Sequence, residues 1–63
     1  MSVRFIRIGY AYTTERGERI FSADVEINGH QGHYFETSAD DVIEAMEAIC
    51  MRLRRDFKTE FDN

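Results

Sequence analysis

Apolar and polar residues alternate along two stretches near the start of the chain, with the period of a strand that buries one face. In the first stretch, residues 3–14, alternate positions are apolar, and in the second, residues 19–28, the alternation is more regular. The apolar positions are Ile6, Ile8, Tyr10 and Tyr12 in the first and Phe21, Ala23, Val25 and Ile27 in the second. We therefore predict two strands that face a common core.

The link between these stretches predicts a hairpin with a four-residue loop at 15–18. In that register Tyr12 lies opposite Phe21 and Ile6 lies opposite Ile27. All the apolar residues of the two strands then share one face, as the correct register of a half-buried hairpin requires.

The second link allows two registers. Asn-Gly at 28–29 is a strong signal for a two-residue turn, which would put Tyr34 on the core face. A five-residue loop at 28–32 would instead pair Val25 with Phe35 and turn Phe35 inward. We favour the longer loop, because two glycines flank it and phenylalanine is the more apolar ring.

A helix is predicted over about residues 39–58. Ser38 precedes it as the expected N-cap, and Asp41 lies where the acid of a capping box is expected. From Val42 onward the apolar residues recur at helical spacing and fall on one arc. These residues are Val42, Ile43, Met46, Ile49, Cys50, Leu53 and Phe57.

Together these elements predict an α+β fold, in which a three-stranded antiparallel β-meander precedes one C-terminal amphipathic helix packed on one sheet face. The order is β-β-β-α, with strands at about 3–14, 19–28 and 33–37. The length of 63 residues suits a single domain, residues 1–63. A chain this small buries only roughly 60% of its unfolded surface, so its core is marginal.

The formal charge of −4 is unevenly distributed along the chain. Residues 20–51 hold seven acidic residues and no basic one, whereas the flanking segments have a slight excess of basic residues. The default interpretation is that this block only keeps the protein soluble. The functional interpretation, on which our first functional hypothesis depends, is a surface that binds a protein partner. The candidate partner-binding residues are Asp24, Glu26, Glu36, Asp40, Glu44 and Glu47.

The residue types that perform catalysis or bind metals form no familiar pattern. His30 and His33 lie near the second turn without a complete set of metal ligands, so we expect two solvated histidines. Cys50 lies on the apolar arc of the helix, where burial disfavours a reactive thiolate. We therefore expect no enzymatic activity, no metal site and no cofactor.

An alternative function is nucleic-acid binding by the arginines of the first hairpin, with which tyrosines interleave. These arginines are Arg4, Arg7, Arg16 and Arg19. The order of elements resembles that of two DNA-binding families. The resemblance lies in the run from Gly32 to Asp41 and the helix that follows it, which together cover about half the chain. The two families are the plant ethylene-response-factor domain and the arm-binding domain of tyrosine integrases, and the resemblance implies a sheet lying in the major groove. The predicted open face shows Ser22, Asp24 and Glu26 instead of the families' basic and aromatic residues, so no DNA-contacting residue is carried over.

Four apolar residues fall outside this predicted core. They are Val3, Phe5, Met51 and Phe61. A single helix also cannot fully cover a three-stranded sheet, whose strands lie about 4.8 Å apart. We therefore expect these residues to contact a second copy of the chain in a two-fold homodimer.

These observations favour a small, non-enzymatic protein–protein interaction or regulatory module, such as the accessory or inhibitor proteins of phages and mobile elements. Its expected partners are a second copy and an unidentified protein, rather than nucleic acid or a membrane. No stretch approaches the roughly 18 apolar residues of a membrane span. The first residues also lack the apolar region of a secretion signal, so we expect a cytoplasmic protein.

Overall fold

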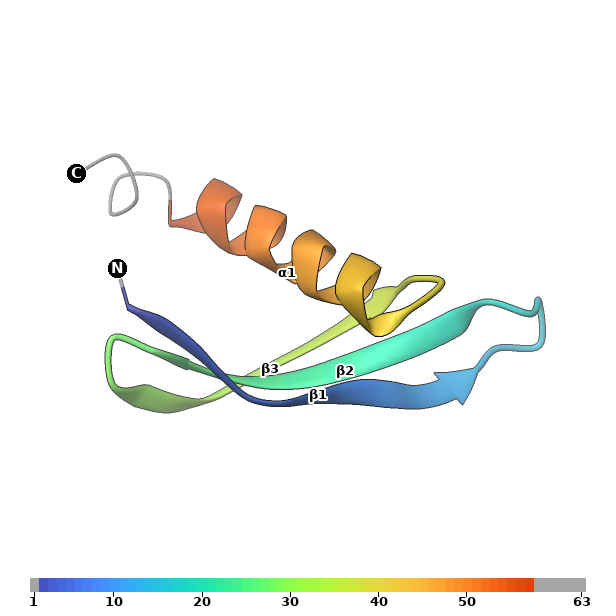
Figure 1. Cartoon of the computed structure of the whole chain (residues 1–63), viewed down its shortest axis with the longest axis horizontal. Helices are drawn as coiled ribbons and strands as arrows, with labels where there is room; N and C mark the ends of the chain where they lie inside the picture. Colours follow the sequence, from blue (N-terminus) through green and yellow to red (C-terminus); the bar gives the residue numbers. More distant parts are fainter. Residues whose placement is uncertain (1, 58–63) are drawn as a thin grey trace.

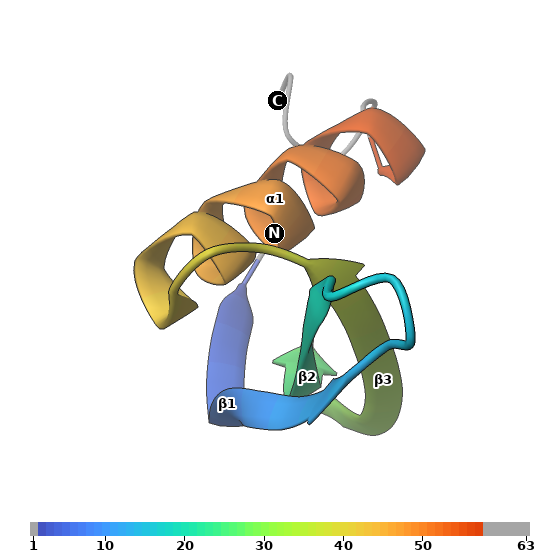
Figure 2. The ribbon, with the colours of Figure 1, turned by 90° about the vertical axis from the view of Figure 1, so that its right-hand side faces the viewer.

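The computed structural model describes residues 2–57, and its elements follow the predicted order β-β-β-α (Figure 1). The strands β1 (Val3–Thr13), β2 (Arg19–Ile27) and β3 (His30–Ser38) form one antiparallel sheet with β2 at its centre. The helix α1 (Val42–Asp56) lies across one face of this sheet and contacts β1 and β3 (Figure 2). The predicted α+β fold is therefore confirmed.

The core lies between β2 and α1. The inward face of β2 is buried at every second residue, as its alternation predicts. From α1, Ala45, Ile49 and Leu53 are buried, and their spacing of four residues places them on one stripe. Burying an isoleucine or leucine side chain, such as those of Ile49 and Leu53, stabilises the fold by about 1.5–3 kcal/mol. The half-buried residues packed around the β2–α1 core are Val3, Phe5, Ile8, Phe35 and Phe57.

The first half of β1 contains a β-bulge, so the predicted register of the first hairpin is wrong. Ile6 is an extra residue between the partners of Val25 and Asp24. An extra residue reverses the facing of the strand, because side chains alternate with a period of two. As a result Val3 and Phe5 pack against the core, and Ile6 is 50% exposed. The prediction that Val3 and Phe5 lie outside the core is therefore wrong.

A second bulge interrupts β1 near its end. Tyr10 lies opposite Phe21, and their rings meet edge to face with centroids 6.0 Å apart. Ala11 is then the extra residue, and Tyr12 lies opposite Ile20. Tyr12 thus faces the side of the sheet away from α1, where it is 49% exposed, rather than inward as predicted.

The loop between β1 and β2 is one residue shorter than predicted. The backbone N–H of Thr14 donates to the carbonyl oxygen of Glu18 at 2.8 Å, which leaves residues 15–17 as the loop. Gly17 donates its N–H to the carbonyl oxygen of Thr14 at 3.0 Å and has a φ of +86°. A tight turn followed by a left-handed residue is a common three-residue hairpin connection, and it shifts the register by one residue.

A two-residue turn, Asn28-Gly29, joins β2 and β3 in place of the predicted five-residue loop. Both residues have positive φ, +51° and +80°, as the favoured hairpin turn requires. An extra residue in β3 near Gly32, whose φ is +94°, then shifts the pairing so that Phe35 lies opposite Ala23. Phe35 therefore packs against the core as predicted, although its loop and its partner residue differ.

The helix begins later than predicted, because β3 continues through the expected N-cap. Ser38 is the last residue of β3 and lies opposite Ile20. Asp41 is the N-cap instead, since its Oδ1 accepts a hydrogen bond from the backbone N–H of Glu44 at 2.8 Å. The predicted helix end near residue 58 lies outside the described residues.

The buried stripe of α1 is narrower than the predicted apolar arc. Ile43 is 64% exposed, Val42 and Met46 are each 38% exposed, and Cys50 is half-buried at the edge of the core. The sheet is twisted, so a helix lying across it contacts it along one narrow line. The apolar residues of α1 on one side of that line are therefore not covered by the sheet.

Candidate interaction surfaces

The sheet has one face covered by α1 and an opposite face that the helix leaves open, which we call the outer face. The outer face of β2 consists of Ile20 and the three polar residues that alternate with its buried ones. Their cross-strand neighbours on β1 and β3 complete it. The outer face comprises Arg4, Arg7, Gly9, Tyr12, Ile20, Ser22, Asp24, Glu26, Tyr34, Glu36 and Ser38.

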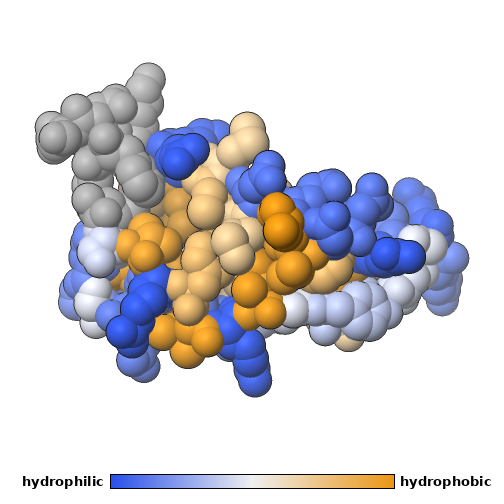
Figure 3. All heavy atoms as spheres, viewed as in Figure 1, coloured by the Kyte–Doolittle hydropathy of each residue, from blue (hydrophilic) through white to orange (hydrophobic). Residues whose placement is uncertain are grey.

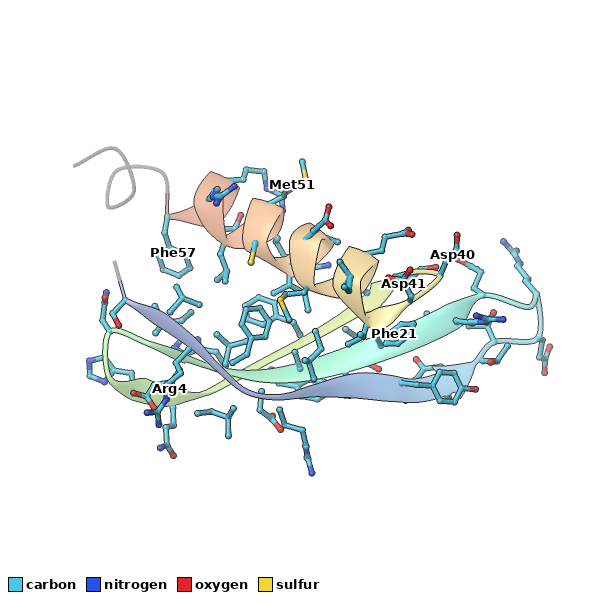
Figure 4. All side chains as sticks on the ribbon, in the orientation of Figure 1. Arg4, Phe21, Asp40, Asp41, Met51 and Phe57 are labelled. Carbon is cyan, nitrogen blue, oxygen red and sulfur yellow. The ribbon has the colours of Figure 1, made fainter. Side chains whose placement is uncertain are left out.

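Two cross-strand ion pairs neutralise much of the charge on the outer face. Nη2 of Arg4 lies 3.2 Å from Oε2 of Glu26, and Nη2 of Arg7 lies 3.2 Å from Oδ2 of Asp24. Both arginines are largely exposed, and Figure 4 shows Arg4 extending from the side of the sheet away from α1. Exposed pairs of this kind stabilise a fold by at most about 1 kcal/mol, so a partner can compete for these groups.

Tyr12, Tyr34 and Glu36 lie together on the outer face. The negative charge of Glu36 raises the pKa of Tyr12 above its ordinary value, and a hydrogen bond between their side chains adds to this effect. Tyr34 lies opposite Asp24 and is 59% exposed. Two exposed aromatic rings therefore flank a carboxylate that makes no ion pair within residues 2–57.

A shallow depression of about 240 Å³ lies between β1 and β2. Gly9 contributes to it by lacking a side chain, since no atom lies within 4 Å of the position that a Cβ would occupy. The lining residues are Arg7, Gly9, Tyr10, Ser22 and Asp24. The depression is open and mostly polar, so it adds relief to the outer face without forming an enclosed cleft.

A second surface lies along the side of α1 that is nearer to β1. Figure 3 shows apolar side chains gathered between α1 and β1. A depression of about 400 Å³ on this side is lined by Met46, Glu47, Cys50, Met51 and Arg54. A smaller one of about 170 Å³ is lined by Val3, Cys50, Leu53 and Arg54. Met51, one of the candidate dimer residues, is 69% exposed and points away from the sheet (Figure 4).

The six acidic residues predicted to bind a partner do not form one surface. Asp24, Glu26 and Glu36 lie on the outer face. Asp40, Glu44 and Glu47 lie before or within the first turns of α1, on the other side of the sheet. The acidic block is continuous in sequence, but the fold divides it between two faces.

The four candidate arginines are divided in the same way. Arg4 and Arg7 lie on the outer face in ion pairs, whereas Arg16 lies at the exposed tip of the first loop. Arg19 donates from Nη1 to the carbonyl oxygen of Asp40 at 3.1 Å, which ties the start of β2 to the segment before α1. The first hairpin therefore presents no continuous basic surface.

The candidate chemical groups are also separated. His30 is exposed at the start of β3, and His33 is half-buried opposite Val25. In the described part of the chain, no group of three or more His, Cys, Asp and Glu side chains is placed to hold a metal ion. No helix among residues 2–57 is long and apolar enough to cross a membrane. Candidate Phe61 lies outside the described residues.

Alternation alone assigns Tyr12 to the core, and the structure places it on the outer face instead. The sequence carries a signal for the first bulge of β1, at Ile6, but no signal of this kind for the bulge at Ala11 that moves Tyr12, because Tyr12 keeps the phase of Tyr10. Val3 and Phe5 are apolar on the opposite phase to Ile8 and Tyr10, and a change of phase within one strand indicates an extra residue.

Comparison of the chain with protein-family models, curated proteins and solved structures finds no match. The outer face and the uncovered side of α1 therefore provide the basis for a functional proposal. The outer face combines exposed tyrosines with arginines and carboxylates, whereas the side of α1 is mainly apolar.

Proposed function

We propose that this protein is a small, non-enzymatic regulatory module that acts in the cytoplasm and binds a protein partner through the outer face of its sheet. The exposed pair Tyr12 and Tyr34, on a face that α1 leaves open, is the observation that supports this most strongly. Tyrosine supplies a large contact area at low entropic cost, and tyrosine and arginine are enriched at protein interfaces.

The charges of the outer face favour a protein partner over nucleic acid. Arg4 and Arg7 each pair with a carboxylate, and Glu36 adds a further negative charge beside Tyr12. Phosphate groups would have to displace these carboxylates and approach Glu36, which Coulomb repulsion opposes. A protein surface can match both signs in one contact, and a basic group opposite Glu36 would complement its charge.

Affinity capture from the native host tests this proposal by comparing the wild-type protein with the double variant Tyr12→Ala/Tyr34→Ala. Both side chains are exposed, so the variant should remain folded, which circular dichroism checks. We expect at least a tenfold loss of bound partner, because interface hot spots contribute about 2 kcal/mol or more.

Tyr10→Ala is the matched control, since Tyr10 lies on the same strand, is as exposed as Tyr34 and has its ring against Phe21 on the other face. It should capture the partner as the wild type does. Unchanged capture by the double variant, or an equal loss with the control, would contradict the proposal.

Nucleic-acid binding is the second candidate function, because exposed Arg7 shares the outer face with two tyrosines that can stack on bases. Titration with duplex and single-stranded oligonucleotides at low salt separates the two functions. Binding that weakens steeply with added salt would support nucleic-acid binding, and no binding at low salt would exclude it.

A further inference from the structure

One side of α1 carries a line of apolar residues that the sheet does not cover. Ile43, Met46 and Cys50 follow one another at intervals of three and four residues, so they are neighbours on the helix surface. Ile43 is 64% exposed, and Cys50 is half-buried. We call these three residues the helix seam.

The charges beside the helix seam change sign along α1. Glu47, in the first half of the helix, and Arg54, in the second, border the helix seam. Arg55 pairs with Asp56, whereas Glu47 and Arg54 form no ion pair within the described part of the chain. Glu47 and Arg54 are seven residues apart, which is about two turns, and both line the depression beside Cys50.

We propose that a second copy of the chain covers the helix seam, with the two α1 helices antiparallel about a two-fold axis near Cys50. Glu47 of each copy then lies beside Arg54 of the other, because the axis passes between these two positions in the sequence. A parallel pairing would instead place Glu47 beside Glu47 and Arg54 beside Arg54, where like charges repel. The antiparallel arrangement also aligns opposite ends of the helix dipoles, and its two-fold symmetry closes the assembly.

The surface beside the helix seam has a shape that suits this contact. The depression of about 400 Å³ is open and is lined by Met46 and Met51 on either side of Cys50. Methionine side chains are flexible and adapt to irregular surfaces, so those of each copy can fill the depression of the other. Because this surface lies on the opposite side of the sheet from the outer face, the dimer and partner binding do not depend on each other.

Cross-linking tests the position of the axis, since Cys50 is the only cysteine of the chain. An axis near Cys50 brings the two thiols within reach of a short bismaleimide linker. We expect the wild-type protein to sediment as a dimer at high micromolar concentration and to give a cross-linked dimer, and Cys50→Ser to give none. A 7.4 kDa monomer under these conditions would overturn the proposal, as would a dimer that does not cross-link.

Charge exchange tests the pairing of the helices. Glu47→Arg and Arg54→Glu each create like-charge contacts in the dimer, and each should weaken self-association by about tenfold. An equal mixture of the two variants should associate as tightly as the wild type, because each copy then meets the opposite charge. Circular dichroism checks that both variants remain folded.

The mixture distinguishes a dimer that forms through the helix seam from one that forms elsewhere, for example through the open edge of β1. Weakening in both single variants together with restoration in the mixture supports the antiparallel pairing of α1, because a parallel pair already holds like charges in the wild type and would gain no like-charge contact in either single variant. Association that neither single variant alters, or that the mixture fails to restore, overturns it.

Discussion

β1 and β2 are neighbouring strands with similar alternation in sequence, yet only β2 buries the residues that its pattern predicts. β2 pairs on both sides, whereas β1 lies at an edge of the sheet and carries two bulges. The extra residue of the second hairpin lies on β3, the other edge strand. An extra residue in a central strand would disturb the hydrogen bonds on both of its sides, whereas an edge strand has only one ladder to accommodate it. Alternation is therefore a better guide to the central strand than to either edge.

The bulges of β1 also determine which residues are available for binding. They turn Val3 and Phe5 toward the core and place Tyr12 on the outer face beside Glu36. A regular β1 in the predicted register would leave the outer face without Tyr12. The irregular strand thus supplies the surface on which the proposed function rests.

The largest expected effect contrasts the same substitution in the two strands. Ile27→Ala in β2 removes a buried side chain and should lower the free energy of unfolding by about 2–5 kcal/mol. Ile6→Ala at the bulge of β1 should change it by no more than about 0.5 kcal/mol, as exposed substitutions do. Urea denaturation measures both. Equal losses would mean that Ile6 faces Ile27 in the core, as alternation predicts.

A smaller contrast lies within β1 itself. Phe5→Ala removes a half-buried ring from the core and should cost about 2 kcal/mol, roughly half of the cost for a fully buried phenylalanine. Tyr12→Ala should cost about 0.5 kcal/mol, because this ring is largely exposed. Thermal melting compares the stability of the two variants. A greater loss of stability in Tyr12→Ala than in Phe5→Ala would mean that Tyr12, and not Phe5, packs in the core, as the regular register predicts.

The smallest effect concerns the titration of Tyr12. Its pKa lies above the ordinary 10.0 because of the charge of Glu36, so Glu36→Gln should lower the pKa toward that value. The folded state favours the neutral hydroxyl, and this contribution to stability is therefore present below pH 10.0 and lost as the pH rises through the folded-state pKa. NMR titration of the tyrosine rings measures the shift.

Glu15→Gln, a change on the exposed first loop, serves as the control for this titration and should leave the pKa of Tyr12 where it is. An unchanged pKa in the Glu36→Gln variant would place Tyr12 away from Glu36. The second bulge of β1 would then be absent.

The start of α1 shows why local signals located the helix but not its first residue. Ser38 and Asp41 are both good N-caps by residue type. Ser38 is excluded because its backbone lies in β3 opposite Ile20, so Asp41 caps the helix through the N–H of Glu44. The choice between two suitable caps depended on a strand pairing that lies outside the local sequence.

The sequence by itself determined the β-β-β-α order, the buried face of β2 and the inward position of Phe35, because periodicity and side-chain type are local properties. Tertiary structure decided the length of the first turn and where β1 and β3 take an extra residue, because register depends on hydrogen bonds across strands and on turn geometry. It also divided the acidic block between the outer face and α1 and set Arg4 and Arg7 against carboxylates. Residues close in sequence lie on opposite faces wherever the chain alternates or turns, so the charge of a segment does not determine the charge of a surface.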